Sequence, residues 1–448
     1  MYAVYFIRKN DMKKHFSHIA RDIGVFIAVI VLLWGFLMLT SLIPNKAIYD
    51  NMMESASQLN PDIEDVALEY EGQKWNTFID YYADSILTQI AWNMGNGNAV
   101  KSSVDTNYFD GERLGVYAGL QLAIIGVAEP NVDYSRYWHG TAGFIRLFHL
   151  FTDINGIKAI GFSVIMILAL AVILLLCRKK QYAVAIVFLL SLIAVKIWVL
   201  LYCIEYQPAF AIGLLMCVLF LLFEKKGDNA LFTLSVLSGT LIAFFDFLTT
   251  ETLAILLPLI FVVLVRTKED RLGEFKPNVS RLFFCGLRFV MAYGATFLAK
   301  WSIASIITGE NKFALAFSSA GVRFAGEITE IQADTLWERI YSAILSNFSM
   351  LFNATKVRID VPLAVAGICI SLLVIGLFCY IFHKENNYGV GIKLLLLLGS
   401  VVIARFVIMN NHSILHMLFT YRALVSTMVA VFGAVILSVS KGKIKDGK

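Results

Sequence analysis

The sequence is poor in charged residues. Asp, Glu, Lys and Arg make up only 16% of its 448 residues, whereas apolar residues make up 58%. Soluble domains of ordinary size carry about 25% charged residues and cannot hide so much apolar surface. The composition therefore excludes an ordinary soluble protein and predicts that lipid covers much of the surface.

Cysteine and proline are also scarce, with six and seven residues. The cysteines show no CxxC spacing, so the sequence predicts no disulfide framework. With so few prolines the apolar runs are largely uninterrupted, unlike the broken helices of many transporters. The net charge of +5 comes from residues that flank the apolar runs, so it does not indicate nucleic-acid binding.

Apolar runs long enough to cross a bilayer predict an all-α, polytopic transmembrane bundle of about ten helices. The runs cover residues 22–43, 157–177, 182–203, 208–223, 231–246, 252–265, 282–306, 361–382, 389–409 and 423–440. The first run is too long for a cleaved signal peptide and lacks a small-residue cleavage site, so we expect a retained helix. No internal repeat or linker divides the chain, which predicts one integrated membrane domain over residues 1–448.

Basic residues indicate the orientation, because Lys and Arg near a span are retained in the cytoplasm. Clusters flank the runs at residues 8–21, 178–180, 225–226, 266–281, 384 and 441–448. All of them agree with an even number of spans whose N-terminus (1–21) and C-terminus (441–448) are cytoplasmic. We expect a multi-pass protein of the bacterial plasma membrane.

Residues 44–156 are predicted to form a large exported loop. Between Pro44 and Asp133 there are fourteen acidic residues and four basic ones, the reverse of the cytoplasmic flanks. Helical apolar patterns at 75–92 and 114–127, and the aromatic and basic stretch 134–149, are too short or too polar to span. They predict interfacial helices in this loop. A second exported loop, at 307–360, has helical periodicity over 331–352.

Ionisable residues concentrate at the exported ends of the predicted spans. Such groups are expensive at membrane depth and usually face a cavity or one another. The set comprises Asp80, Asp84, Arg136, His139, Asp246, Glu251, Lys300, Arg405, His412, His416 and Arg422. Their presence on one face predicts a functional site there.

Asp80 and Asp84 are candidates for a catalytic base. They are four residues apart, so a helix presents both carboxylates on one face. A solvated acidic face explains such a pair equally well, although aromatic residues flank it on both sides. Tyr137 and Trp138 are candidates to stack on a sugar ring or a lipid headgroup, and belt aromatics are the alternative.

The segment from His412 to Arg422 is a candidate anion site. His412 and His416 lie one helical turn apart, and Arg422 follows. Arginine matches phosphate oxygens bidentately, and Arg405 and Lys300 are candidates to neutralise the same group. The spacing signals no third zinc ligand, so we expect no metal and no cofactor. Interfacial histidines and a snorkelling arginine are the alternative.

The chain resembles the GT-C superfamily of membrane glycosyltransferases in its layout. It also resembles polytopic membrane proteins of Firmicutes. The resemblance rests on the layout of one span, a large exported loop with carboxylates, and many further spans. The motifs that resemble those of the Firmicutes proteins are Asp80-Tyr-Tyr-Ala-Asp84, Tyr134-Ser-Arg-Tyr-Trp-His139, Asp246-Phe-Leu-Thr-Thr250 and the segment 411–422.

The resemblance implies transfer of a sugar from a polyprenyl-phosphate donor to a glycan, teichoic acid or lipid of the cell envelope. In that reading Asp80 or Asp84 is the base, and Arg422, Arg405 and His416 bind the phosphate. Family members often have an acidic pair soon after the first span, where this chain has Asp50 and Glu54. Asp50 is therefore an alternative base.

Three other functions remain open. A transporter or flippase of lipid-linked glycans also needs ionisable groups and many spans. A polysaccharide polymerase or ligase would build its site from the 307–360 loop, with Arg323 and Arg339. A scaffold without catalysis would tolerate changes at all these positions.

Overall fold

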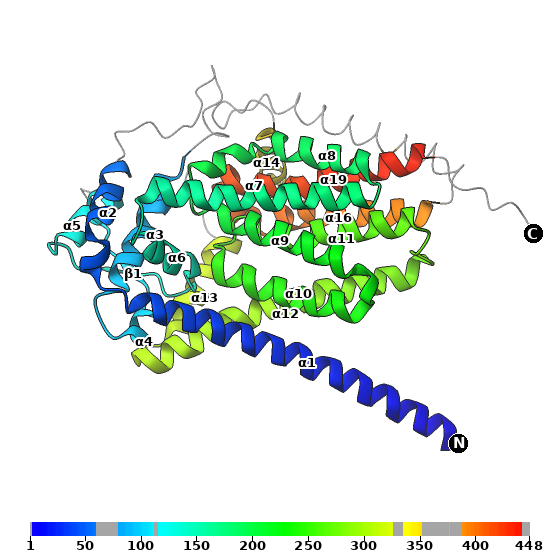
Figure 1. Ribbon diagram of the computed structural model, residues 1–448, viewed down its shortest axis with the longest axis horizontal. Coiled ribbons are helices and arrows are strands. Elements are labelled where there is room, and N and C mark those ends of the chain that lie inside the picture. The colour runs from blue at the N-terminus through cyan, green and yellow to red at the C-terminus, as the bar shows by residue number, and fades with distance from the viewer. Residues whose placement is uncertain are drawn as a thin grey trace, which may run out of the picture.

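The computed structural model describes residues 2–59, 79–111, 115–325, 335–351, 376 and 388–440, and these are almost entirely helical (Figure 1). Strand structure within them is limited to the two-residue strands β1 (Asn107–Tyr108) and β2 (Val132–Asp133). These pair antiparallel, with Asn107 opposite Asp133. The predicted all-α class is confirmed.

Seven helical segments in the described part of the chain are long and apolar enough to cross a membrane. They are α1 (Tyr2–Ser41), α7 (Ile154–Arg178), α9 (Gln207–Phe223), α10 (Asp228–Phe245), α12 (Phe275–Thr308), α16 (Gly389–Ile408) and the continuous segment of α18 (Met417–Thr420), η4 (Tyr421–Ala423) and α19 (Leu424–Val439). The chain is therefore a multi-pass membrane protein.

Seven candidate spans occur in the described part of the chain, against the about ten that were predicted. Helix α8 (Tyr182–Ala194) has 13 residues and α11 (Leu253–Lys268) has 16, so both are shorter than the roughly 17–25 residues of a typical span. Helix α8 ends because Lys196 adopts a left-handed conformation and the chain continues as η2 (Ile197–Leu201). Hydropathy does not detect such a backbone break. The run at 361–382 lies outside the described residues.

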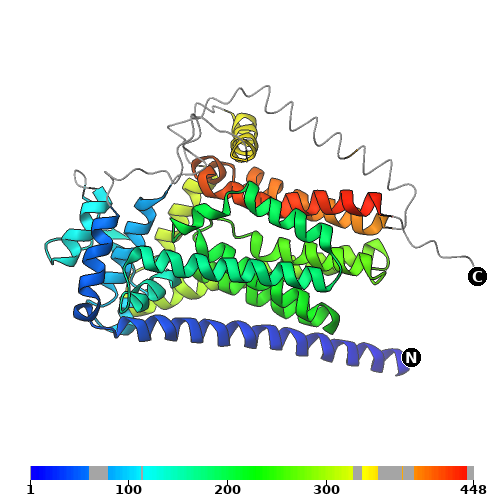
Figure 2. The same cartoon turned by 45° about the horizontal axis from the view of Figure 1, so that its top comes forward.

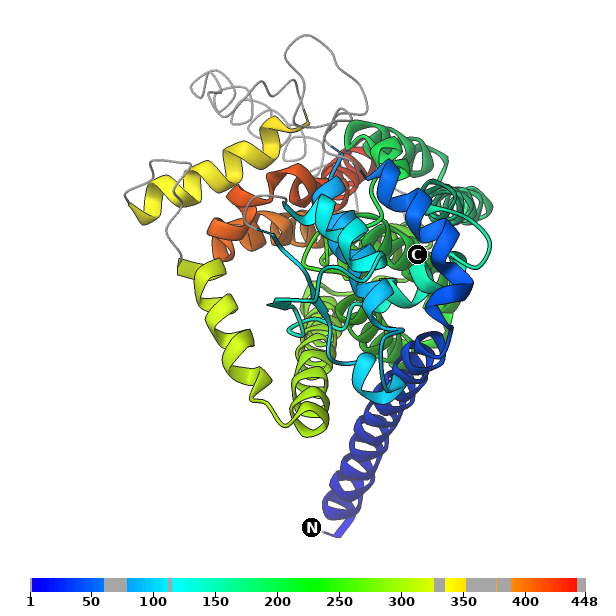
Figure 3. The ribbon, with the colours of Figure 1, turned by 90° about the vertical axis from the view of Figure 1, so that its left-hand side faces the viewer.

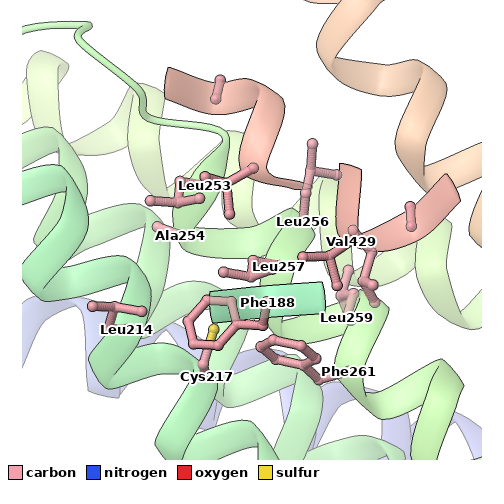
Figure 4. Packing of buried hydrophobic residues seen from close by; sticks show 14 of the residues in the cluster. Phe188, Leu214, Cys217, Leu253, Ala254, Leu256, Leu257, Leu259, Phe261 and Val429 are labelled. Carbon is pink, nitrogen blue, oxygen red and sulfur yellow. The ribbon is translucent and has the colours of Figure 1, made fainter. Parts of the chain in front are cut away.

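Helix α11 lies at the centre of the bundle. Every residue from Leu253 to Thr267 is buried, and α9, α10, α16 and α19 pack around it. Figure 4 shows Phe188 of α8 and Cys217 of α9 beside Leu257 and Phe261 of α11. A helix that is apolar on all sides is expected at such a position. Because neighbouring helices cover it, α11 needs no contact with lipid.

The outer surface of the bundle is apolar. Large exposed side chains occur on α1, α7, α8 and α12, including Leu32, Ile167, Ile186 and Met291, which are between 59% and 73% exposed. A soluble protein would not present such a surface. Lipid is its natural solvent, as the composition predicts.

One end of the bundle carries a buried ionic cluster around Glu224 of η3 (Glu224–Lys226). This carboxylate accepts from Lys179 at 3.1 Å and from Arg271 at 2.8 and 2.9 Å, and Arg266 lies 3.7 Å away. The cluster joins the loops that follow α7, α9 and α11. Helix α1 begins and α19 ends at this same end (Figure 1). Its assignment to the cytoplasm stays a prediction from the charge bias.

The other end carries the α2–α6 segment, the described residues between Asn45 and Phe148. It contains α2 (Asn45–Gln58), α3 (Tyr81–Asn93), α4 (Ala99–Ser102), α5 (Gly115–Ile124) and α6 (Gly140–Phe148). Figure 3 shows this segment covering the end of the bundle. The helices predicted in this loop are present as α3, α5 and α6. Arg146 fixes the segment, because it donates to Thr40 O at 2.9 Å and Ala91 O at 2.8 Å.

Three more helices lie near this end: α13 (Lys312–Ala325), α14 (Leu336–Ser349) and α17 (Asn410–Leu415). Helix α14 corresponds to the predicted periodicity over 331–352 and begins with a capping box of Thr335 and Glu338. It is yellow in Figure 2 and packs against α16, α17 and α18. Asn347 joins it to α17 and α18, because it donates to Ser413 O at 2.7 Å and accepts from Thr420 at 2.6 Å.

Candidate functional site

Asp84 is a buried structural carboxylate. It is 0% exposed and lies 3.0 Å from Lys158 Nζ of α7. Its Oδ1 accepts from the backbone N–H groups of Ile204 at 2.9 Å and Glu205 at 3.3 Å. Burial raises its pKa, and Lys158 opposes that rise. These contacts tie α3 to α7 and to the loop before α9.

Asp80 is the more accessible of the two predicted carboxylates. It caps the N-terminus of α3, where its Oδ1 accepts from Ala83 N at 3.0 Å, and it is partly exposed. Its Oδ2 accepts from the Tyr206 hydroxyl at 3.4 Å. A cap of this kind satisfies a backbone donor that the helix leaves unpaired. The second oxygen faces the end of α9.

Arg422 lies beside the Tyr206 ring. It is 1% exposed, and its Cζ is 4.9 Å from the ring centres of both Tyr206 and Tyr421. Its Nη1 donates to Leu418 O at 2.7 Å, whereas its Nε has no hydrogen-bond partner among the described residues. Within that part of the chain the guanidinium forms no ion pair with a carboxylate.

A second cation, Lys196, lies beside Arg422. Its Nζ donates to Met350 O at 3.2 Å and is 6.0 Å from the Tyr421 ring. Burial lowers its pKa to about 8, and the charge of Arg422 adds to that effect. No carboxylate pairs with it in the described structure. Two adjacent cations that are buried and have no carboxylate partner among the described residues favour the binding of an anion.

Lys196 was not among the residues singled out from the sequence. It falls inside the apolar run 182–203, which was assigned to a transmembrane helix. A lysine at membrane depth was the available signal, because such residues are expensive and commonly functional. We call Asp80, Lys196, Tyr206, Phe419 and Arg422 the Tyr206 site.

The two predicted histidines connect the Tyr206 site to the end of α16. Phe419 lies 5.4 Å from the Tyr206 ring and stacks on His416 at 5.1 Å. His416 lies 4.6 Å from His412, and His412 Nδ1 lies 3.4 Å from Arg405 Nη2. Residues that are far apart in the sequence thus form one run of contacts.

Arg405 binds groups of the protein itself. It donates to Glu251 at 2.9 and 3.2 Å, to Leu248 O at 3.1 Å and to Ser413 Oγ at 3.0 Å. A bidentate pair of this kind fixes geometry. Arg405 and Glu251 therefore hold the α10–α11 turn against α16 and α17, and the guanidinium is already neutralised.

Asp246 begins that turn and is buried. It accepts from Thr249 N at 3.0 Å and from the Thr249 hydroxyl. Burial raises the pKa of Asp246 to about 7, the hydrogen bonds from Thr249 oppose the rise, and the charge of Glu251 adds to it. A carboxyl group in this range can exchange a proton near neutral pH.

Lys300 and Trp138 fasten the 134–139 loop to α12. Lys300 Nζ donates to Val104 O at 2.7 Å and lies 5.4 Å from the Trp138 ring. Trp138 donates to Thr296 O at 2.8 Å and stacks on Phe244 at 4.9 Å. Both side chains are completely buried. Their contacts therefore position the loop.

The remaining residues of that loop pack around Phe247. Tyr137 lies 5.4 Å and His139 5.0 Å from the Phe247 ring, while Arg136 lies 4.1 Å above the Tyr134 ring. His139 begins α6 in a left-handed conformation with φ 54. Of the predicted residues, Asp80 and Arg422 contact Tyr206, whereas Tyr137 and His139 belong to a group around Phe247.

A metal site is not indicated by the described residues, which contain no cluster of three or more His, Cys, Asp or Glu side chains. The described cysteines, Cys177, Cys203, Cys217 and Cys285, are unpaired. Comparisons with known proteins gave no relative: no family model, no curated protein and no solved structure matches the chain.

Proposed function

We propose that the protein is a membrane glycosyltransferase that moves a sugar from a polyprenyl-phosphate donor to an exported acceptor of the cell envelope. The observation that carries the proposal is the Tyr206 site. Its tyrosine hydroxyl donates to Asp80 at 3.4 Å, while its ring lies 4.9 Å from the buried Arg422 guanidinium. The resemblance to GT-C enzymes in layout supports the same reading.

The chemistry needs one base and one anion site. Asp80 accepts the proton of the acceptor hydroxyl while the oxygen of that hydroxyl attacks the anomeric carbon of the donor sugar. The bond from that carbon to the phosphate oxygen breaks, and the phosphate departs with the bonding electron pair. The leaving group gains one negative charge in this step. Arg422 and Lys196 bind it more strongly than the ground-state diester, which lowers the barrier.

The surroundings suit a lipid-linked donor. The apolar outer surface of the bundle lets the polyprenyl chain remain in the bilayer, and the α2–α6 segment covers the end at which the charged groups gather. Arg405 and Lys300 are bound to internal partners, so we assign the donor phosphate to Arg422 and Lys196. Two cations match a single phosphate better than a diphosphate.

Substitution of Asp80 by Asn tests the base. Asn is also a good N-cap, so we expect normal insertion and unchanged thermal stability. Transfer of labelled sugar from polyprenyl phosphate, in membranes that contain the variant, should fall by about 100-fold or more. Exported glycan composition in a complemented deletion strain gives the second readout.

The Asp50→Asn variant is the matched control, because Asp50 is the alternative base and is exposed on α2. Transfer by this variant should equal that of the wild type. Full transfer by Asp80→Asn would contradict the proposed base. Export of the glycan without any transfer in membranes would instead favour a flippase.

A further inference from the structure

The group around Phe247 contains buried polar atoms without partners. His139 is 0% exposed, and its Nε2 has no hydrogen-bond partner among the described residues. The same holds for the Tyr293 hydroxyl of α12. An unpaired buried polar group is unfavourable, and native proteins keep few of them. A bound molecule that supplies the missing partners would explain their presence.

These atoms belong to one neighbourhood. Tyr137 lies 5.4 Å from Phe247 and 6.0 Å from Phe297, and Phe297 lies 5.2 Å from Tyr293. Asp246 and Glu251, at the two ends of the Phe247 turn, act electrostatically on the Tyr293 hydroxyl. The 134–139 loop, the turn and α12 thus meet around these aromatic rings.

Two residues near Phe247 have a strained backbone. His139 has φ 54 and Leu248 has φ 69, and the His139 ring lies 5.0 Å from the Phe247 ring. A left-handed conformation is unfavourable for an L-residue other than glycine. Strain of this kind persists where the surroundings enforce it, and it clusters at binding and catalytic sites.

The charges select the chemical class of the ligand. The His139 Nδ1 lies 3.1 Å from Tyr137 O, so Nε2 is left as a hydrogen-bond acceptor. Burial, together with the charges of Lys300 and Arg136, holds the pKa of His139 well below 6.5, so the ring is neutral. Those two cations disfavour a cationic ligand, and the carboxyl groups of Asp246 and Glu251 disfavour an anionic one. Uncharged hydroxyl groups fit both conditions.

We infer that Tyr137, His139, Asp246, Phe247 and Tyr293 form a binding site for an uncharged sugar ring, hereafter the Phe247 site. The aromatic residues contact the apolar face of the ring. His139 Nε2 accepts a hydrogen bond from one sugar hydroxyl, and the Tyr293 hydroxyl forms a hydrogen bond with another sugar hydroxyl. The role of this sugar rests on the proposed function, because the Phe247 site would hold the sugar that the transferase moves.

Binding of simple glycosides to the full-length protein in lipid nanodiscs tests this site. The probes are the methyl glycosides of glucose, galactose and N-acetylglucosamine, with methyl glucuronide as the charged counterpart, and saturation-transfer NMR detects them. At least one neutral glycoside should bind, and the glucuronide should not. Tyr293→Phe should weaken that binding about tenfold, as expected when one hydrogen bond is lost.

Tyr293→Phe also separates a binding role from a structural one. Because the hydroxyl has no partner in the described structure, its removal should leave the melting temperature unchanged or raise it. His139→Asn keeps a residue that tolerates the left-handed conformation but shortens the side chain, so it should also weaken binding. Tyr341→Phe, at an exposed tyrosine of α14, is the matched control.

Two results would overturn the inference. One is the absence of binding by every neutral glycoside. The other is binding that Tyr293→Phe and His139→Asn leave unchanged, which would mean that ordered water fills the unpaired positions. Failure of the proposed function looks different: the glycosides would bind, yet no sugar would be transferred from polyprenyl phosphate.

Discussion

At the scale of single residues, burial determines what each charged group can do. Arg405 is fully engaged with Glu251 and Leu248, whereas Arg422 retains an unpaired Nε. The residue type is the same, but the environments assign one to structure and leave the other available for an anion. Asp80 and Asp84 differ in the same way, since one is partly exposed and the other is paired with Lys158.

Asp246 makes stability depend on pH. Its pKa is raised from 3.8 to about 7, so the folded protein holds the proton more tightly than the unfolded chain. Stability therefore falls as pH rises from about 4 to 7, by a total on the order of 4 kcal/mol, and levels off above pH 7. Asp246→Asn should remove this slope and be more stable than the wild type at pH 8. Melting temperatures between pH 5 and 8 check this.

The matched control for that experiment is Asp50→Asn on the surface of α2, which should follow the wild-type curve. An identical fall in melting temperature for Asp246→Asn and the wild type would mean that other groups cause the pH dependence.

At the scale of elements, ion pairs fasten the helices together at both ends of the bundle. Glu224 joins the loops that follow α7, α9 and α11, and Asp84 joins α3 to α7. Removing one partner of a buried pair leaves an uncompensated charge, whereas replacing both can be neutral. The tightness of such a contact therefore says little about its net contribution to stability.

The Asp84–Lys158 pair allows a direct test. Asp84→Asn leaves the Lys158 ammonium buried without a counter-charge, so stability should fall by about 3–5 kcal/mol. The double variant Asp84→Asn with Lys158→Met removes that charge and should recover most of the loss. Thermal unfolding in detergent measures both. If the double variant were no more stable than the single one, the ion pair would not be the reason for the loss.

At the scale of the whole molecule, the two ends of the bundle differ in what they carry. One end holds the Glu224 cluster, and the other holds the α2–α6 segment, the Tyr206 site and the Phe247 site. The basic flanks predict that the Glu224 end faces the cytoplasm. The proposed transfer would then take place on the exported face.

Cysteine labelling tests that orientation. In a variant without the six native cysteines, a membrane-impermeant maleimide should label Lys101→Cys in intact cells, because Lys101 is exposed on α4. Lys225→Cys, which is comparably exposed at the other end, should react only after the cells are opened. The reverse pattern would invert the topology and exclude an exported site.

Several features follow from local sequence. The apolar composition predicts the membrane class, and the helical patterns at 75–92, 114–127 and 331–352 overlap α3, α5 and α14. The basic flanks and the ionisable set predict two unlike ends. Helix formation and lipid exposure depend on residues a few positions apart, so a single sequence contains most of that information.

Tertiary structure alone decided which of these charges are available. Glu251 lies 154 positions from Arg405, and Val104 lies 196 positions from Lys300. Asp84 and Lys158 are likewise far apart along the chain. Lys196 lies between α8 and η2, where its Nζ donates to Met350 O and its charge interacts with that of Arg422. Pairing and burial depend on three-dimensional distance, which hydropathy and spacing do not encode. For that reason the sequence supplied the candidate residues, and the fold decided which of them have partners within the protein.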